Sequence, residues 1–319
     1  MIQAGVRGEL GIRRARESGA RGPGAEGPAG WGPGGWGEGP GRRGSGGLGS
    51  WNVMALTDAA LRPPLDPAAL NARLVRPGGL WREIRVIQET GSTNADLLKE
   101  ARAGAAEGLV LVAETQTAGR GRLDRTWSSP PRAALTVSVL LRPAGVPPAA
   151  LAWLPLLTGI AVAAALRDEA GVTAGLKWPN DVLVADRKIA GILAEVHGDA
   201  IVAGVGLNVT LTEAELPVPA ATSLLLENAA CLDRERLLAA VLTKLAGRYT
   251  AWAAGPDAAA LREEYLRWCV TVGREVRVEL PGGAVLTGTA ADVDESGRLA
   301  VRTGSGTTLV GAGDVVHVR

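Results

Sequence analysis

The sequence predicts an α+β protein made of two units. From about Trp81 to Val270, short apolar runs alternate with stretches of good helix formers, which is typical of a sheet with packed helices. After Val270, short strands follow one another at roughly ten-residue spacing with Gly-rich turns, which favours a small β-barrel. Apolar residues make up 46% of the 319 residues, so the chain can bury a sizeable core.

The chain begins with a segment of different composition. Residues 1–53 are rich in Gly, Pro and Arg and have no periodic apolar pattern, so we expect them to be disordered. Alternatively, translation starts at Met54 and this segment is a mis-assigned extension. Gly44 to Gly49 match the GxGxxG dinucleotide pattern, but no strand precedes them and no helix follows. Residues 54–81 form a lead-in segment.

Residues 82–270 are expected to form the larger domain. Ser92, Thr93 and Asn94 supply polar caps for the helix that follows. The apolar stretch 151–166 is shorter than the about 20 residues that cross a membrane, so we expect a buried helix and no membrane partner. Helices are expected at 95–103, 151–166, 234–253 and 258–268, and strands at 84–87, 109–113, 134–141, 182–184, 189–196 and 201–209.

Residues 271–319 are expected to form the smaller, C-terminal domain. Val276, Val278 and Leu280 alternate with charged residues, which predicts a half-buried strand, and Pro281-Gly282-Gly283 predicts the turn after it.

Composition excludes several classes of protein. The formal net charge is +1, so the basic balance of a non-specific nucleic-acid binder is absent. Two Cys and two His residues provide neither a disulfide framework nor a His-rich metal site. A reducing, cytoplasmic location follows as the expectation.

A Gly-Arg loop carries the first candidate site. Gly119, Arg120, Gly121 and Arg122 follow a buried strand, where ligands collect in α/β sheets. Arginine is a permanently charged, forked donor that suits phosphate or carboxylate, and Trp127 adds a flat apolar face. A solvated surface loop remains an equal alternative from these residues alone.

Two rare lysines carry the second candidate site. Only four of the 34 basic residues are Lys, and Lys177 and Lys188 are two of them. A compact ammonium serves where arginine cannot replace it. Alternatively, Trp178-Pro179-Asn180-Asp181 after Lys177 is only a turn. A third candidate, Gly204-Val-Gly206-Leu-Asn208, indicates a close approach to the strand or ordinary packing.

Taken together, these motifs resemble those of the biotin protein ligases. The resemblance rests on Gly91-Ser-Thr-Asn94, Glu114 to Arg122, Trp127 to Pro130, Lys177 to Asp181, Lys188 to Gly191 and Gly204 to Asn208. It implies a mixed-sheet catalytic domain of the class II synthetase type, with packed helices, followed by an SH3-like β-barrel. It also implies the short form of the family, since residues 1–80 show no paired helices of a DNA-binding domain.

The resemblance implies a reaction and its site. Biotin and ATP, with Mg²⁺, would form biotinyl-5′-AMP, and the biotinyl group would pass to a lysine of a biotin carboxyl carrier domain. Lys177 and Arg122 would be catalytic. Biotin would be bound by Ser92, Thr93, Asn94, Gln116, Gly119, Arg120, Gly121, Arg122 and Lys177, and ATP or the adenylate by Arg120, Arg122, Trp127, Lys188 and Asn208.

The sequence leaves other functions open. A lipoate or octanoyl ligase or transferase of the same fold and a biotin-responsive DNA-binding regulator are the rivals. The resemblance implies no nucleic-acid partner and a monomer or homodimer, and it identifies neither the Mg²⁺ ligands nor the base for the acceptor lysine. Asp181 is a candidate for that base.

Overall fold

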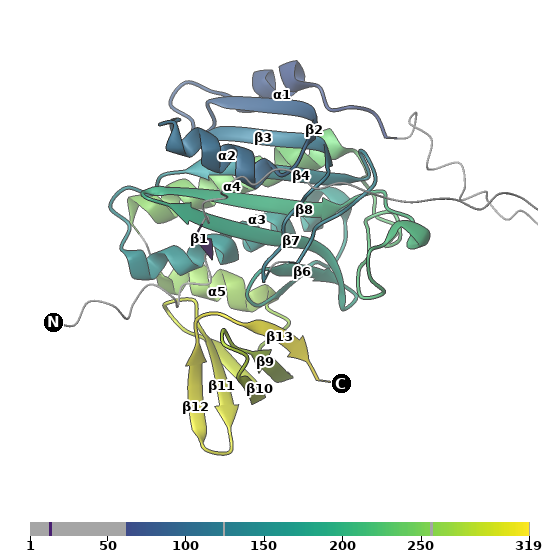
Figure 1. The fold of residues 1–319 in the computed structure, drawn as a ribbon. Helices are drawn as coiled ribbons and strands as arrows, with labels where there is room; N and C mark the ends of the chain where they lie inside the picture. The colour runs from purple at the N-terminus through teal and green to yellow at the C-terminus, as the bar shows by residue number, and fades with distance from the viewer. Residues whose placement is uncertain (1–12, 15–61, 124, 256–257, 319) are drawn as a thin grey trace, which may run out of the picture.

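The structure, a computed structural model, describes residues 13–14, 62–123, 125–255 and 258–318 (Figure 1). The expectations for residues 1–53 lie outside this part of the chain, as do Met54 and the Gly44–Gly49 pattern. Of residues 1–53, the structure describes only the two-residue strand β1 (Arg13–Arg14), which pairs in parallel with β7 (Arg187–His197).

The larger unit is built on a mixed sheet with the order β2-β3-β4-β8-β7-β6-β5. Its first pair, β2 and β3, is parallel, and the other neighbours are antiparallel. The strands are β2 (Glu83–Thr90), β3 (Leu109–Gln116), β4 (Ala134–Leu141), β5 (Gly175–Lys177), β6 (Asp181–Val184), β7 (Arg187–His197) and β8 (Ala200–Asn208). The mixed sheet with packed helices confirms the predicted class.

Helices cover the two faces of this sheet unequally. On one face, α2 (Thr93–Arg102) packs its Leu97 and Leu98 against β3, β4 and β8. On the other face lie α3 (Trp153–Ala170), α4 (Arg234–Ala254) and α5 (Ala258–Trp268), with the main core between them and the strands. Because α2 is short, it leaves part of its own face without a covering helix.

The apolar stretch predicted to be a buried helix is one. It continues from a 3₁₀ helix, η3 (Pro148–Ala152), into α3, whose residues are almost all buried. Of the residues that the structure describes, only Pro148–Ala170 is long and apolar enough to cross a membrane, and most of it lies inside the protein.

The lead-in segment contains a helix that the sequence did not predict, α1 (Pro67–Leu74). Asp66 caps it by accepting from the backbone N–H groups of Ala68 and Ala69, and Pro67 occupies its first turn. The Asp-Pro pair was therefore an available signal. A second 3₁₀ helix, η4 (Glu213–Glu215), follows β8.

The C-terminal unit is a five-stranded antiparallel sheet with the order β12-β11-β10-β9-β13. Its strands are β9 (Glu275–Glu279), β10 (Val285–Val293), β11 (Leu299–Thr303), β12 (Gly306–Val310) and β13 (Asp314–His317). The end strands β12 and β13 are not paired with each other within residues 258–318, so closure into an SH3-like barrel stays a prediction. In Figure 1 this sheet lies below the large one.

Candidate active site

The part of the sheet that α2 leaves uncovered carries a cavity of about 620 Å³. Its wall comes from four places: the N-terminus of α2, the loop after β3, the segment after β8 and the edge of the C-terminal sheet. We call residues 117–123 and 125–130 the Gly-Arg loop and residues 209–223 the β8 loop. Such a cavity has the size of a small-molecule site.

The floor of the cavity follows the period-two alternation of the strands. On β8, Gly204, Val205, Gly206 and Asn208 contribute to the cavity lining, and Val205 also belongs to the main core cluster, as Ala203 and Leu207 do. On β4, Thr136 and Ser138 line the cavity in the same way. Small and polar residues therefore occupy one face of strands that are apolar on the other face.

The two floor glycines are required by close approaches. A Cβ at Gly204 would lie 2.2 Å from Asn94 Oδ1, and a Cβ at Gly206 would lie 2.4 Å from Trp127 Cε2. Real side chains do not tolerate such distances, so these glycines let the Asn94 amide and the Trp127 ring lie on the sheet. The interpretation of the Gly204–Asn208 pattern as a site of close approach is confirmed.

A buried polar network ties the start of α2 to the sheet. Both hydrogens of the Asn94 amide are donated inward, to Leu193 O at 3.1 Å and to Glu195 Oε2 at 2.9 Å. Ser138 Oγ lies 2.6 Å from Asn94 Oδ1. Asn94 is therefore fixed, and only its Oδ1 retains capacity for a ligand, as an acceptor.

Gln116 and Thr93 extend this network. Gln116 Oε1 accepts from the backbone N–H of Thr93 at 2.8 Å and from its hydroxyl at 3.0 Å. No acceptor among the described residues takes the hydrogens of the Gln116 amide, so both remain as donors at the cavity wall. Ser92, the N-cap of α2, accepts from Ala95 N and lines the same wall.

The Gly-Arg loop contacts the turn that follows Lys177. Arg122 Nη1 donates to Asn180 Oδ1 at 3.0 Å, and Asn180 Nδ2 donates to Ile192 O. Arg120 pairs with the buried carboxylate of Glu195 at 3.3 Å. The two cationic motifs therefore meet in one cavity, although 58 residues separate Arg122 from Asn180.

The two lysines line this cavity from neighbouring parts of the sheet. Lys188 Nζ lies 2.6 Å from Asp181 Oδ1 and would lie 3.0 Å from a Cβ at Gly191, beside the Trp127 ring. The Lys177 side chain is half-buried rather than buried, and no ion pair joins it to a carboxylate of residues 62–123, 125–255 or 258–318. Its ammonium is available to an anionic ligand.

Two residues of the C-terminal unit lie at the end of the cavity that contains Lys177, which we call the cationic end. Arg274, which pairs with Asp186 at 2.8 Å, and His317 line the cavity near Lys177. Burial, followed by the charges of Lys177 and Arg274, lowers the pKa of His317 to about 4. His317 is therefore neutral at pH 7, and its ring bonds the Thr271 hydroxyl at 3.1 Å.

The Gly-Arg loop also contacts the C-terminal unit. Arg125 pairs with Asp314 at 2.5 Å, and Arg122 Nη2 donates to Gly313 O at 3.2 Å. The loop thus lies between the two units.

Two family models match the chain. The model of the biotin/lipoate A/B protein ligase family matches residues 85–211, and that of the biotin protein ligase C terminal domain matches residues 271–318. The chain is also 47% identical over 264 residues to the biotin–[acetyl-CoA-carboxylase] ligase of Mycobacterium tuberculosis, covering 81% of this chain and 98% of that protein. The chain belongs to the biotin protein ligase family.

Other members of the family support this assignment. The chain is 38% identical to the bifunctional ligase/repressor BirA of Escherichia coli over 53% of each chain. The biotin protein ligase of Aquifex aeolicus, solved in complex with biotin and ATP, superimposes with a TM-score of 0.65 at 28% identity, covering 75% of this chain and all of that one.

In this member of the biotin protein ligase family, the residues singled out in the sequence meet in one place. The cavity is lined by Ser92, Thr93, Asn94, Gln116, Arg120, Gly121, Arg122, Trp127, Lys177, Lys188 and Asn208. Gly119 lies behind the wall instead, because a Cβ there would lie 2.3 Å from Trp127 O and 2.8 Å from Gln116 Nε2. Its role is to allow this packing.

Several residues that line the cavity, or that hold its lining residues in place, were missed by the sequence analysis. Thr136 and Ser138 stand two apart within an apolar run, and Glu195 is a lone carboxylate in another. A polar residue inside a buried strand is a usable signal, because its burial must be balanced by partners. The β8 loop and the C-terminal residues Arg274 and His317 gave no comparable signal.

The cavity offers Mg²⁺ a limited donor set. Within the part of the chain that the structure describes, no group of three or more His, Cys, Asp or Glu side chains is placed to hold a metal ion. Asp181, Asp186 and Asp314 line the cavity singly, each paired with a cation. This set fits an ion that is held mainly by nucleotide phosphates, as Mg²⁺ commonly is.

Proposed function

We propose that this protein is an ATP-dependent biotin ligase. It joins biotin to ATP as biotinyl-5′-AMP with release of diphosphate, then transfers the biotinyl group to one lysine of a biotin carboxyl carrier domain. The name of the Mycobacterium tuberculosis relative supports an acetyl-CoA carboxylase, or a related biotin-dependent carboxylase, as the source of that domain. The Aquifex aeolicus complex supports biotin and ATP as substrates.

The contact between Arg122 and Asn180 carries this proposal, because it brings the Gly-Arg loop and the lysine strands to one cavity. A biotin carboxylate that attacks an α-phosphate brings two anions together. At 4 Å their repulsion is about 4 kcal/mol with an effective dielectric constant of 20. Lys177, Lys188 and the loop arginines offset it and stabilise the charge that grows on the phosphoryl oxygens.

The biotin ring is assigned to the end of the cavity beside α2. Its ureido group is uncharged and has two N–H donors and one carbonyl acceptor. Asn94 Oδ1 supplies an acceptor, and the Gln116 amide supplies donors. The neutral polar network at this end therefore matches an uncharged ligand group, and the cations lie further along the cavity.

The nucleotide is assigned to the end beside the β8 loop. Trp127 offers a flat face there, and Pro217 and Val218 of the loop add apolar wall. Asn208 donates to Thr222 O at 2.9 Å, so it acts through the loop as well as by facing the cavity. Lys177 and Arg274 would then face the diphosphate that leaves.

The Gly-Arg loop also keeps water from the product. An acyl adenylate hydrolyses when water reaches it, so a loop that covers it raises the yield of transfer. Arg122 holds this loop against Asn180 and Gly313. We therefore assign Arg122 to binding the adenylate and to closure.

Mg²⁺ is proposed as the ion that accompanies ATP. It would neutralise phosphate charge when bound, and the cavity carboxylates, Asp181 first among them, are the candidates to contact it. Since Asp181 pairs with Lys188, its role as the base for the acceptor lysine stays a second hypothesis.

The division into residues 82–270 and 271–319 is part of this proposal, with the first part holding the substrates and the second closing the cationic end. A cytoplasmic location and a monomer or homodimer are proposed with it.

The test is a coupled assay with purified protein, ATP, Mg²⁺, biotin and a carrier domain. We expect biotin-dependent release of diphosphate and one added biotinyl mass on one carrier lysine. A carrier that gains lipoyl or octanoyl mass instead, when all three acids are supplied together, would transfer the assignment to the lipoate ligases of the same fold. No added mass with any of the three acids would remove the proposed function.

A further inference from the structure

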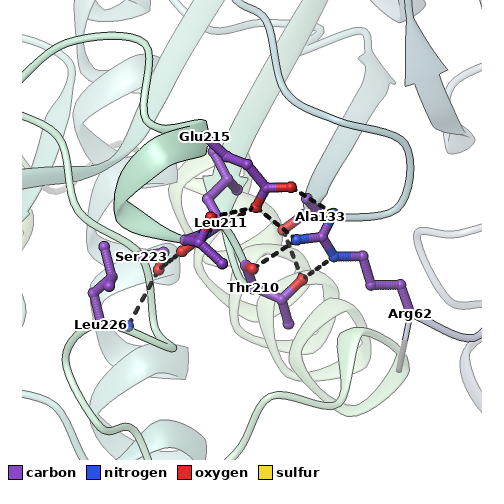
Figure 2. A network of polar contacts seen from close by, with 8 residues as sticks. Arg62, Ala133, Thr210, Leu211, Glu215, Ser223 and Leu226 are labelled. Atoms are coloured by element: carbon purple, nitrogen blue, oxygen red, sulfur yellow. Dashed lines mark hydrogen bonds and ion pairs between the residues drawn. The ribbon is translucent and has the colours of Figure 1, made fainter. Parts of the chain in front are cut away.

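The lead-in segment places a buried arginine against the β8 loop (Figure 2). Arg62 Nε donates to Thr210 Oγ1 at 3.0 Å, and its Nη2 donates to Thr210 O at 2.9 Å. Its two Nη atoms also form a bidentate pair with Glu215, at 3.2 and 2.8 Å. The Arg62 side chain is only 6% exposed, so this charge is buried, and all three guanidinium nitrogens donate hydrogen bonds.

Arg62 belongs to a segment that is itself anchored to the large domain. Arg234 Nη2 donates to Pro63 O at 2.6 Å, and Leu65 N donates to Glu114 Oε1 at 2.7 Å. Glu114 and Arg234 pair with each other at 2.5 Å, and both are buried. These buried contacts therefore hold the backbone next to Arg62 in place.

Glu215 connects Arg62 to the β8 loop. It forms a capping box with Thr212, since Glu215 Oε2 accepts from Thr212 N at 2.9 Å. At the far end of the loop, Ser223 Oγ donates to Leu211 O at 2.6 Å, as Figure 2 also shows. Both ends of the loop are thus held, while Pro217 to Ala220 between them are exposed.

The held loop supports the backbone of a cavity lysine. Lys188 N donates to Ala220 O and Thr222 N donates to Lys188 O, each at 2.8 Å. Asn208 donates to Thr222 O from the adjacent strand. The β8 loop therefore forms an apolar part of the cavity wall and holds the backbone of Lys188 in position.

We propose that Arg62 is a positioning residue for the nucleotide end of the cavity. It acts through Glu215 and the β8 loop, and it touches neither substrate. This inference rests on the proposed function, since it assigns the β8 loop to ATP. Removing Arg62 would loosen the loop and weaken ATP binding, while the biotin end beside α2 would stay intact.

The test uses the full chain with Arg62→Ala, Arg62→Lys and Glu215→Gln. We expect the KM for ATP to rise about tenfold in Arg62→Ala, because hydrogen bonds to a charged group are lost. Arg62→Lys keeps the charge but loses the forked donor, so its KM for ATP should lie between those of the parent and Arg62→Ala. The Kd for biotin, measured without ATP by calorimetry, should stay within about twofold in every variant.

Amide exchange of the substrate-free protein provides a readout that does not depend on the reaction. Residues 211–222 should exchange faster in the Arg62 variants, and α2 should not change. Arg73→Ala, an exposed arginine of the same lead-in, is the matched control and should change nothing.

Unchanged exchange in the loop and an unchanged KM for ATP would overturn the inference. An equal loss of biotin and ATP binding would overturn it as well, because it would indicate general destabilisation. If Arg62→Ala does not fold, Arg62→Lys and Glu215→Gln decide by the same measurements. A parent protein that makes no adenylate would remove the proposed function, whereas the exchange result would still decide whether Arg62 holds the loop.

Discussion

The two faces of the large sheet differ in what their side chains do. Towards α3 and α4, the strands present Leu135, Val139 and Leu207, which are buried in the main apolar cluster. Towards the cavity, the same strands present Ser138 and Gly206 at intervening positions. A period of two along each strand therefore separates residues that hold the fold from residues that shape the site.

This difference predicts that the two kinds of variant can be told apart on a single strand. A change on the α3 face should lower stability and leave substrate binding alone, because that face contributes packed apolar area. A change on the cavity face should weaken substrate binding and leave stability unchanged. The predictions below test this separation in order of decreasing effect.

The largest effect is expected from the two cavity lysines. Lys177→Ala and Lys188→Ala should each lower biotin-dependent release of diphosphate about 100-fold or more, since each removes a fixed cation from the developing charge. Thermal unfolding should stay close to that of the parent. Lys99→Ala, on the exposed side of α2, is the matched control and should keep full activity. A loss of only a few-fold in a lysine variant would remove that lysine from the mechanism.

Neighbouring residues on β8 give the sharpest contrast. Gly206→Ala should raise the KM for ATP at least about tenfold, because its Cβ would meet the Trp127 ring at 2.4 Å. Leu207→Ala should instead cost about 2–5 kcal/mol of unfolding free energy and leave the KM values unchanged. Denaturant unfolding and steady-state kinetics measure both quantities. If both variants lost stability equally and kept equal KM values, the separation of the faces would be wrong.

The cavity could be predicted from the sequence because its motifs are compact in the chain. Arg120 and Arg122 lie within one loop, and Lys177 to Asp181 form one turn, so residue types and spacing were visible. Ser138, Glu195 and Arg62 could not be assigned in this way. Their partners lie far along the chain, as Arg62 and Thr210 do at a separation of 148 residues, and only folding brings them together.

The strands and most helices were predictable for a related reason. Runs such as Leu109–Ala113 are apolar throughout, and Asp233 caps α4 as its position suggested. Because the strands are mostly apolar, few positions show which face lies towards the cavity, and in β4 only Thr136 and Ser138 do so. The missed helix α1 is short and rests on α4 and β2, so tertiary packing supports it more than its own pattern does.

A smaller effect is expected at the buried carboxylate of Glu195. Glu195→Gln keeps an acceptor for the Asn94 amide but removes the charge that pairs with Arg120. We expect the kcat for adenylate formation to fall about tenfold, with the Kd for biotin within about twofold. Glu195→Ala should in addition weaken biotin binding, because Asn94 loses a partner. Equal biotin affinity in Glu195→Ala and the parent would contradict the role given to Asn94.

The smallest effect concerns the pH dependence of stability. The pKa of His317 is about 4 in the folded chain, below the value of about 6.5 of an unfolded one. Between these values the unfolded chain binds the proton and the folded chain does not, so stability falls as the pH drops from about 6.5 towards 4. His317→Gln should lose less stability over this range than the parent. Parallel curves of melting temperature against pH for the two proteins would contradict this assignment.

A crystal structure with a non-hydrolysable analogue of biotinyl-5′-AMP tests the central claim most directly. We predict that the analogue lies on the Gly204–Gly206 face, with its bicyclic ring beside Asn94 and its adenine against Trp127. Its phosphate position should lie within about 4 Å of a nitrogen of Arg122 and of Lys177 or Lys188. An analogue bound outside this cavity, or bound inside it with all three of these cations turned away, would contradict the account.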